Sequence, residues 1–334
     1  MIDAFLDFRE GASHLLAPVD ARAEWAFFTN GDDGFVQRTW AREQGMSPRT
    51  HLGDILKAQI EAHRAEVFYN LDATGLEDGF IRTLPGCVKK TIAWHAAPFR
   101  SVKFSDYDLV VCNFPSILAA LEAQGCRTDL FWPAHDPQWD SYAACRDRPI
   151  DVVFVGGYSR HHGRRARVLE AVAGLAQESK IIYRLDRSRL CRFAESPIGH
   201  LLPLAKFRRP PAIVAASQPP VFGRDFYRVL SAAKIVLNGA IDMAAEDRGN
   251  MRCFEALGSG ALLLSDRGNY PEGMQDEETL AIYNSPEDAI KQVRRFLGAS
   301  DERLRIARDG HTMVSTLYSK QAQWKRFETL VATI

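Results

Sequence analysis

The stretch RCFEALGSGALLL, residues 252–264, combines a helix, a glycine-rich turn and a buried strand. We predict the helix over residues 250–257, stopped by Gly258, and the strand over the apolar run 261–264. So short a passage from a helix to a fully apolar strand is typical of a parallel α/β sheet.

Glu255 is the unusual member of this stretch, because it is an acid among apolar residues. Burying an unpaired carboxylate destabilises a fold by several kcal/mol. We therefore expect Glu255 to face a polar ligand or an arginine. A purely structural salt bridge with Arg248 or Arg252 is the alternative.

The same alternation of strands and helices extends in both directions along the chain. Strands are predicted at residues 25–29, 67–69, 90–94, 109–112, 129–132, 152–155, 180–185 and 235–237. Helices are predicted at residues 1–16, 55–63, 115–124, 164–175, 226–233, 318–331 and directly after Ser285, which is followed by proline and acids as a helix start requires.

The pattern restarts after Arg148-Pro149, which indicates two domains in these 334 residues. The expected fold is α/β, with two doubly wound, Rossmann-like domains facing across a cleft. We assign residues 1–147 to an N-terminal Rossmann-like domain and 148–316 to a C-terminal Rossmann-like domain. Residues 317–334 form a C-terminal helix, for which crossing back to the N-terminal domain is one option.

Composition excludes several classes of protein. Apolar residues make up 46% and charged residues 25% of the chain, as in ordinary globular proteins. No apolar run approaches the roughly 20 residues of a membrane span, the first residues do not resemble a signal peptide, and the six cysteines lack metal-ligand spacing.

Charge is balanced overall but unevenly distributed. Residues 158–209 hold 12 Lys and Arg against 4 acids. This excess indicates that the second half binds an anion, or it is a solvated basic face. Nucleic acid is not expected as a partner, because the net charge is zero and few aromatic residues lie in the basic stretch.

Gly156 and Gly157 end the apolar run 152–155 and precede a predicted helix. Glycines there let a ligand approach the backbone, and the helix N-terminus favours an anion such as a diphosphate. Arg160 and Arg164 follow closely. A simple tight turn is the alternative, since neither GxGxxG nor a P-loop is present.

The segment FEALGSGALLL resembles the Glu-Ala-x-x-x-Gly segment of GT-B glycosyltransferases, and is especially similar to their CgeB-like and family-4-like members. Further N-terminal segments are similar to that group: HLGDIL (51–56), YNLD (69–72), HAAP (95–98), SDYD (105–108) and HDP (135–137). The resemblance covers roughly residues 24–330. It implies a GT-B fold and transfer of a sugar from a nucleotide-diphosphate sugar to a hydroxyl group. It also implies that residues 1–147 form the acceptor-side domain and residues 148–316 the nucleotide-sugar-binding domain.

The resemblance also implies a donor site. Glu255 would hold the ribose hydroxyls, Gly258 and Gly260 would form the turn under the nucleotide, and Arg160 and Arg164 would contact the diphosphate. The complete set implied for the donor is Gly156, Gly157, Arg160, Arg164, Arg248, Asn250, Arg252, Glu255, Gly258 and Gly260. Asp247 stands where family-4 enzymes carry an earlier catalytic glutamate.

Two further residues are candidates for acid–base chemistry. His95 follows a predicted strand and would act as a general base on the acceptor hydroxyl, unless it is a loop histidine satisfied by the backbone. Asp72, also at a strand end, is the competing base. Asp106-Tyr107-Asp108 matches a DxD metal motif superficially, but no metal or cofactor other than the donor is expected for this fold.

Other functions of the same fold stay open. A nucleotide-sugar epimerase would turn over without an acceptor, and a degenerate module would bind a carbohydrate or partner without catalysis. The acceptor of a transferase would be a carbohydrate, a lipid-linked compound or a protein. We expect a cytoplasmic protein, with peripheral contact at the inner membrane surface as an option.

Overall fold

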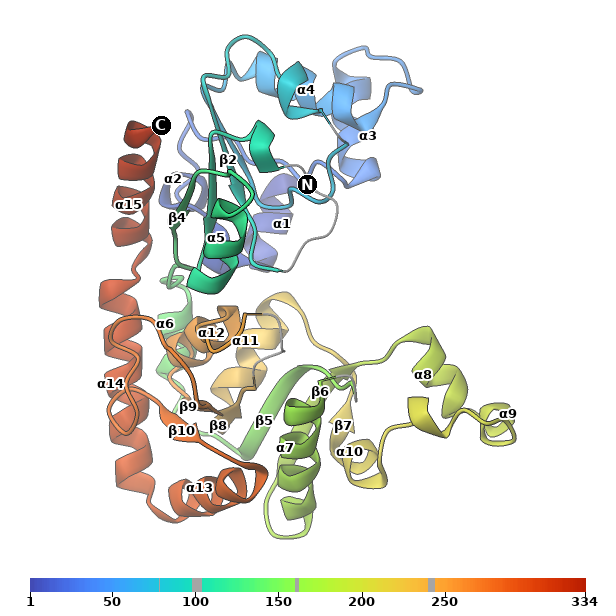
Figure 1. Cartoon of the computed structure of the whole chain (residues 1–334), viewed down its shortest axis with the longest axis vertical. Coiled ribbons are helices and arrows are strands. Elements are labelled where there is room, and N and C mark those ends of the chain that lie inside the picture. The colour runs from blue at the N-terminus through green and yellow to red at the C-terminus, as the bar shows by residue number, and fades with distance from the viewer. Residues whose placement is uncertain (78, 98–103, 160–161, 240–243) are drawn as a thin grey trace. The chain divides into compact units, whose positions relative to one another are not determined.

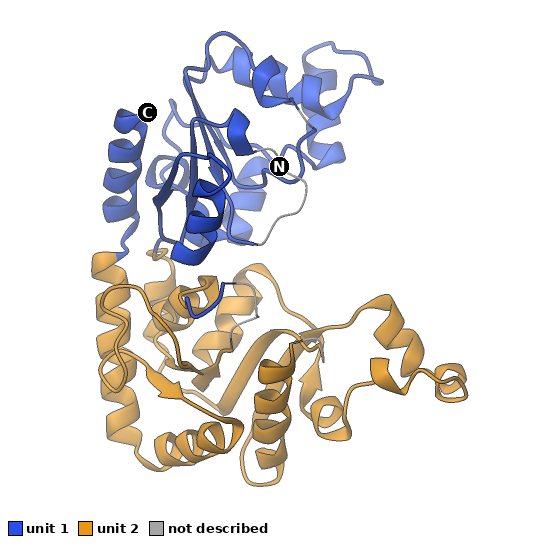
Figure 2. Ribbon diagram, in the orientation of Figure 1, with its two compact units in different colours: residues 1–134, 243–247, 318–334 blue, residues 135–242, 248–317 orange. Residues whose placement is uncertain are grey.

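The computed structural model describes residues 1–77, 79–97, 104–159, 162–239 and 244–334. The chain divides into two compact units (Figure 2). Unit 1 consists of residues 1–134, 243–247 and 318–334, and unit 2 of residues 135–242 and 248–317. Each unit holds one parallel sheet, which confirms the predicted α/β class with two Rossmann-like domains.

The sheet of unit 2 has a strand order with one reversal. Its strands are β5 (Ile150–Gly157), β6 (Ile181–Asp186), β7 (Ser217–Gln218), β8 (Ala233–Leu237), β9 (Leu262–Asp266) and β10 (Ala281–Tyr283). All pair in parallel, in the order β10-β9-β8-β5-β6-β7. The order reverses between β5 and β8, and a doubly wound sheet opens its ligand crevice at the carboxyl ends of such strands.

Helices cover both faces of this sheet (Figure 1). The helices of unit 2 are α6 (Trp139–Ala143), α7 (Gly163–Ala173), α8 (Arg189–Ala194), α9 (Pro197–His200), α10 (Pro211–Ala216), α11 (Gly223–Ser231), α12 (Met251–Gly258), α13 (Pro286–Gly298) and α14 (Ser300–Leu317), of which α8 and α9 project beyond the sheet. One core cluster joins Val152 and Phe154 of β5 to α7, α10, α13 and α14. Val153 and Val155 point to the opposite face and are also buried, so β5 is apolar throughout.

The sheet of unit 1 has its strands in chain order. They are β1 (Val67–Asn70), β2 (Lys90–Trp94), β3 (Leu109–Cys112) and β4 (Thr128–Leu130). The helices are α1 (Ile2–Phe8), α2 (Ala17–Asp20), α3 (Gly34–Glu43), α4 (Leu52–Ala62), α5 (Pro115–Glu122) and α15 (Lys320–Thr333). Short 3-10 helices complete the described chain: η1 (Ala12–His14), η2 (Ile81–Thr83), η3 (Phe104–Asp106), η4 (Gly174–Gln177) and η5 (Ala205–Phe207).

The two faces of the unit 1 sheet are covered by helices from distant parts of the chain. Ile117 and Leu118 of α5 pack with Val110 on one face. Phe327 and Leu330 of α15 pack with alternate residues of β2 and β3 on the other. The C-terminal helix is therefore part of unit 1, and unit 1 first ends at Ala134, whereas we predicted residue 147.

Several predicted elements need correction. Residues 25–29 form no strand: Trp25 is 70% exposed, and Phe27 stacks on His63 with ring centroids 3.9 Å apart. The helix predicted over residues 1–16 ends at Phe8, because Arg9 and Gly11 take left-handed conformations with φ of 66° and 63°. Nine α-helices and strands of the described residues were not predicted: α2, α3, α6, α8, α9, α10, α14, β7 and β10. The start of α13 is as predicted, with Ser285 accepting from the Asp288 N–H.

Candidate functional site

The carboxyl ends of the central unit 2 strands form a rigid base for a ligand. Asn238 follows β8 and donates from Nδ2 to Ser265 Oγ at 3.0 Å. The backbone carbonyl of Asn238 accepts a hydrogen bond from the Tyr283 hydroxyl at 2.8 Å. Buried hydrogen bonds thus join the ends of β8, β9 and β10, next to the end of β5 at Gly156 and Gly157.

Glu255 lies on α12 with its side chain only 7% exposed. Arg252 Nη1 is 2.7 Å from Glu255 Oε2, so the structural alternative, a salt bridge with Arg252, does form. The Arg252 guanidinium in turn lies 4.1 Å from the centroid of the Phe226 ring. Within the described residues Glu255 Oε1 accepts no hydrogen bond, so this oxygen is available to a hydroxyl group of a ligand.

Arg248 and Asn250 attach the loop before α12 to the strand ends. Arg248 is 6% exposed, and its Nε lies 2.8 Å from Asp266 Oδ2 at the end of β9. The Asn250 side chain donates to Asn238 Oδ1 at 3.4 Å. Arg248 and Asn250, both predicted to bind the nucleotide-sugar donor, therefore lie at the sheet edge, but these contacts are with protein groups.

The arginines after β5 differ in the direction of their side chains. Arg160 lies outside the described residues, and Arg164, in the first turn of α7, is exposed. Its neighbour Arg165 points toward β8: its Cγ is 3.2 Å from where a Cβ on Gly239 would stand. We missed Arg165, although it is in helical phase with the buried residues Val168, Leu169 and Val172.

Packing explains Gly258 and Gly260. A Cβ on Gly258 would stand 2.3 Å from Cε3 of Trp139, a fully buried residue of α6. Gly260 has a φ of 67°, and a Cβ there would lie 3.0 Å from Ala143. Both glycines let α12 and its turn approach α6 closely, and their contact with a nucleotide stays a prediction.

In unit 1, His95 follows β2 and is 8% exposed. Its backbone N–H donates to the Val111 carbonyl at 3.0 Å, which extends the hydrogen bonding between β2 and β3 by one residue. The centroid of its ring lies 4.7 Å from that of the Phe104 ring. Burial lowers the pKa of His95, while a hydrogen bond with the Ala97 backbone and the Asp72 charge oppose that shift. The imidazole is therefore neutral near pH 7, as a general base must be.

The two candidate catalytic aspartates have structural partners. Asp72 Oδ1 accepts from the N–H groups of Thr74 at 3.1 Å and Gly75 at 3.2 Å, which closes a turn. Asp247 Oδ2 accepts from the Ser116 N–H at 2.7 Å, in the first turn of α5. Asp247 thus stabilises a helix start within unit 1, and its catalytic role stays a prediction.

The DxD match forms ordinary structural contacts. Asp106 Oδ1 lies 2.6 Å from Arg82 Nη2, and Asp108 Oδ2 accepts from the Thr91 backbone N–H at 2.7 Å. Across the described ranges, no three His, Cys, Asp or Glu side chains come close enough together to hold a metal ion.

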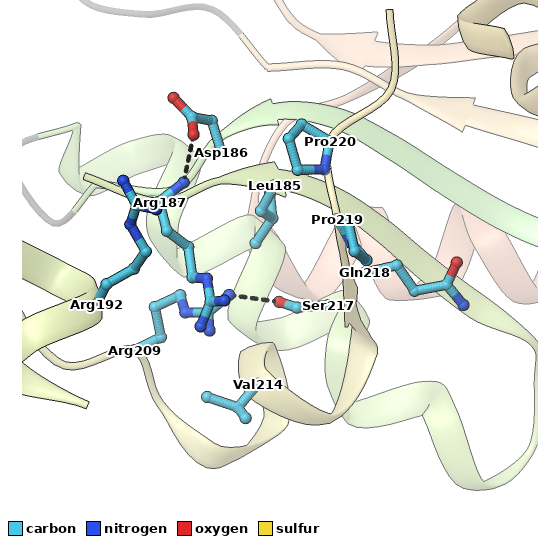
Figure 3. A pocket seen from close by; sticks show the side chains of 10 residues that line it. All are labelled: Leu185, Asp186, Arg187, Arg192, Arg209, Val214, Ser217, Gln218, Pro219 and Pro220. Carbon is cyan, nitrogen blue, oxygen red and sulfur yellow. Dashed lines mark hydrogen bonds between the residues drawn. The ribbon is translucent and has the colours of Figure 1, made fainter. Parts of the chain in front are cut away.

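A cavity of about 410 Å³ lies at the outer strands β6 and β7 of unit 2 (Figure 3). It is lined by Leu185, Asp186, Arg187, Arg192, Arg209, Val214, Ser217, Gln218, Pro219 and Pro220. None of the predicted site residues lines it. It nevertheless borders the predicted diphosphate turn, because Asp186 is the register partner of Gly157.

Comparison with known proteins supports the assignment from both sequence and fold. Residues 199–329 match the family model described as "Glycosyl transferase-like". A search of curated proteins gave no match.

Solved structures share the fold at low identity. HepE from Anabaena in complex with UDP has a TM-score of 0.54 at 11% identity, over 85% of this chain and 82% of HepE. Sucrose-phosphate synthase from Thermosynechococcus elongatus has a TM-score of 0.53 at 15% identity, over 84% of this chain and 76% of that one. A glycosyltransferase from Rickettsia africae has a TM-score of 0.54 at 10% identity, over 91% and 83% of the two chains.

These matches confirm the predicted GT-B fold and show a glycosyltransferase-like domain over residues 199–329, while the likeness to CgeB-like and family-4-like members stays a prediction. None of the helices in the described part of the chain combines the length and apolar character of a membrane span. The chain carries a glycosyltransferase-like domain on a GT-B fold.

Proposed function

We propose that the protein transfers a sugar from a nucleoside-diphosphate sugar to a hydroxyl group, with the donor bound at the carboxyl edge of the unit 2 sheet. The observation that carries this proposal is Glu255, a nearly buried carboxylate whose Oε2 is held by Arg252 and whose Oε1 is available. A carboxylate fixed in this way suits the hydroxyl groups of a ribose.

Uridine is the first base to test. HepE was solved with UDP and with UDP-glucose, and a pneumococcal O-GlcNAc transferase was solved with UDP and GlcNAc. Those ligands belong to proteins that share the fold with this chain at about a tenth identity, so other nucleotides are included in the test.

The leaving diphosphate requires positive charge. We assign this role to Arg165, because its side chain points toward the turn after β8, beside the glycine end of β5. Guanidinium groups stabilise the charge that develops on a leaving diphosphate. Arg164, which the family resemblance favours, is exposed and is the weaker candidate.

His95 is the proposed base for the acceptor hydroxyl. It directly follows β2, an inner strand of the unit 1 sheet, and burial keeps its imidazole neutral. The charge of nearby Asp72 would stabilise the imidazolium that forms when the proton is taken. We propose that neither a metal nor a further cofactor takes part, so that transfer continues in a chelator.

The acceptor class is a carbohydrate, a lipid-linked compound or a protein, and its hydroxyl is the attacking group. We place the protein in the cytoplasm, with an option of contact at the inner membrane surface. These assignments follow from the family resemblance.

Calorimetric titration of UDP and UDP-sugars tests the donor site. Glu255→Gln keeps the side-chain shape but replaces the carboxylate, and we expect at least a roughly tenfold weaker Kd because a charge-assisted hydrogen bond is lost. Glu178→Gln is the matched control, since Glu178 forms a similar pair with Arg294 at 2.7 Å on the surface of unit 2.

The same titration compares Arg165→Ala with Arg164→Ala, and only the first is expected to weaken UDP. Equal affinity of wild type and Glu255→Gln for every nucleotide that binds would refute the assigned site. An epimerase would instead turn over UDP-sugar without an acceptor.

A further inference from the structure

Residues 187–209 form a small lobe that we call the basic lobe. It contains α8, α9 and η5, and Figure 1 shows α8 and α9 projecting from the β6–β7 side of unit 2. The family model begins only at residue 199, within this segment. The motifs assigned to the donor site leave the lobe without a role.

The basic lobe is a folded structure with specific contacts. The Arg208 guanidinium donates to three of its carbonyls, those of Ala194 at 3.0 Å, Gly199 at 2.7 Å and Leu202 at 3.1 Å. Arg209 holds Glu195 through two hydrogen bonds of 2.6 and 2.8 Å. These contacts hold the lobe together internally, and they do not involve the exposed apolar side chains on its outside.

Apolar side chains cover the outside of the lobe. Within residues 190–202, five large ones are exposed: Leu190 (43%), Phe193 (46%), Ile198 (66%), Leu201 (87%) and Leu202 (42%). Single exposed leucines are ordinary, but five within one short segment form a patch of the kind that marks an interaction surface.

The charge of the lobe indicates the partner. It has six Lys and Arg residues against one carboxylate, Glu195. Among the described residues, the guanidinium groups of Arg189 and Arg192 have no ion-pair or hydrogen-bond partner, and both residues are exposed. Arg192 also lines the cavity at the foot of the lobe together with Arg187 and Arg209 (Figure 3).

We propose that the basic lobe docks on an anionic phospholipid bilayer. Side chains such as Leu201 and Ile198 would enter the boundary between headgroups and acyl chains, and the arginines would contact lipid phosphates. Charge complementarity selects this partner, because a zwitterionic surface or an acceptor sugar offers nothing to unpaired guanidinium groups beside exposed leucines. The docking is independent of donor binding and of sugar transfer.

Vesicle flotation without nucleotide tests the proposal on the full chain. We expect the wild-type protein to float with phosphatidylglycerol-containing vesicles and to bind phosphatidylcholine vesicles only weakly. High salt should release part of the bound protein from the phosphatidylglycerol-containing vesicles. Ile198→Ser with Leu201→Ser should abolish most binding, and Arg189→Ala with Arg192→Ala should weaken it by about fivefold for each charge removed.

Matched controls separate docking from general surface changes. Phe35 and Leu304 are 73% and 53% exposed but lie outside the lobe, so Phe35→Ser with Leu304→Ser should float as wild type does. All variants should keep the wild-type midpoint in urea denaturation, which shows that they are folded whether or not the protein binds UDP.

Three outcomes would overturn the proposal. They are absence of flotation in wild type, equal flotation of the Ile198 and Leu201 variant, or equal affinity for both kinds of vesicle. Size-exclusion chromatography with light scattering adds a fourth: a wild-type dimer that the double serine variant dissociates would make the lobe an interface between two copies.

Discussion

Units 1 and 2 are both parallel α/β layers, but their strand orders differ. The strands of unit 1 follow one another in chain order, whereas those of unit 2 reverse between β5 and β8. Only the reversal creates a crevice between strand ends, because the connections on its two sides leave toward opposite faces of the sheet. Unit 2 therefore has the architecture of a ligand-binding sheet.

The polar groups at the two sheet edges differ in the same sense. In unit 1, the carboxylates of Asp72 and Asp247 accept hydrogen bonds from a turn and a helix start. In unit 2, Glu255 retains an oxygen without a partner among the described residues. The carboxylates of Asp72 and Asp247 thus support structure in unit 1, whereas Glu255, as we propose, binds a ligand in unit 2.

The largest expected effect comes from filling the contact between α12 and α6 in unit 2. Gly258→Ala places a methyl group 2.3 Å from Cε3 of the fully buried Trp139 ring, so that the ring or α12 must shift. We expect unit 2 to lose about 3 kcal/mol of unfolding free energy, measured by urea denaturation.

Gly298→Ala is the control for Gly258→Ala, because a Cβ on Gly298 would meet nothing within 4 Å. Hydrogen exchange should show faster exchange in unit 2 and unchanged exchange in unit 1. Equal stability of both alanine variants would mean that α6 and α12 tolerate separation.

Acid should weaken unit 1 more than unit 2. Burial, with the neighbouring Lys320, lowers the pKa of His14 to about 4. A histidine whose pKa is depressed in the folded state stabilises above the unfolded pKa near 6.5, and this stability is lost as the pH falls. From about pH 7 to about pH 5 the loss is about 2 kcal/mol.

Substitution of the histidine checks the assignment. His14→Gln should flatten the fall in urea midpoint between those pH values, whatever its stability at neutral pH. In unit 2, burial also lowers the pKa of His135, but its hydrogen bond to Asp140 opposes the shift. An unchanged pH profile in His14→Gln would assign the acid sensitivity to other groups.

Local patterns predicted the parts of the fold that depend on continuous apolar runs. The strands β2 and β3 agree residue for residue, because such runs are buried on both faces. The strand predicted at residues 25–29 is wrong because the aromatic side chains of this segment pack individually against different partners. The ring centroids of Trp25 and Trp324 lie 5.7 Å apart, and those of Phe28 and Phe5 lie 5.6 Å apart. A local sequence pattern cannot show a contact with α15, which lies about 300 residues further along the chain.

The candidate site was predicted in part for a similar reason. Glu255 was identified because an acid in an apolar helix contradicts its surroundings. Arg165 was missed in favour of Arg164, since one residue along a helix turns the side chain by about 100° and the family motif does not specify that turn. The structural partners of Asp72 and Asp247 are long-range or conformational contacts that a spacing cannot show.

The smallest effect concerns the carboxylate of Asp247 in unit 1. Asp247→Ala removes the acceptor for the Ser116 N–H in the first turn of α5, and helix starts of this kind contribute about 1 kcal/mol. Asp247→Asn keeps an acceptor oxygen and should recover most of that stability in urea denaturation. Asp225→Ala, which removes an exposed ion pair with Arg228 in unit 2, should change stability by less than about 0.5 kcal/mol. If Asp247 has the catalytic role of the family acid, the asparagine variant will lose transfer activity while remaining stable; if the structural contact is its whole function, stability and activity will change together and only slightly.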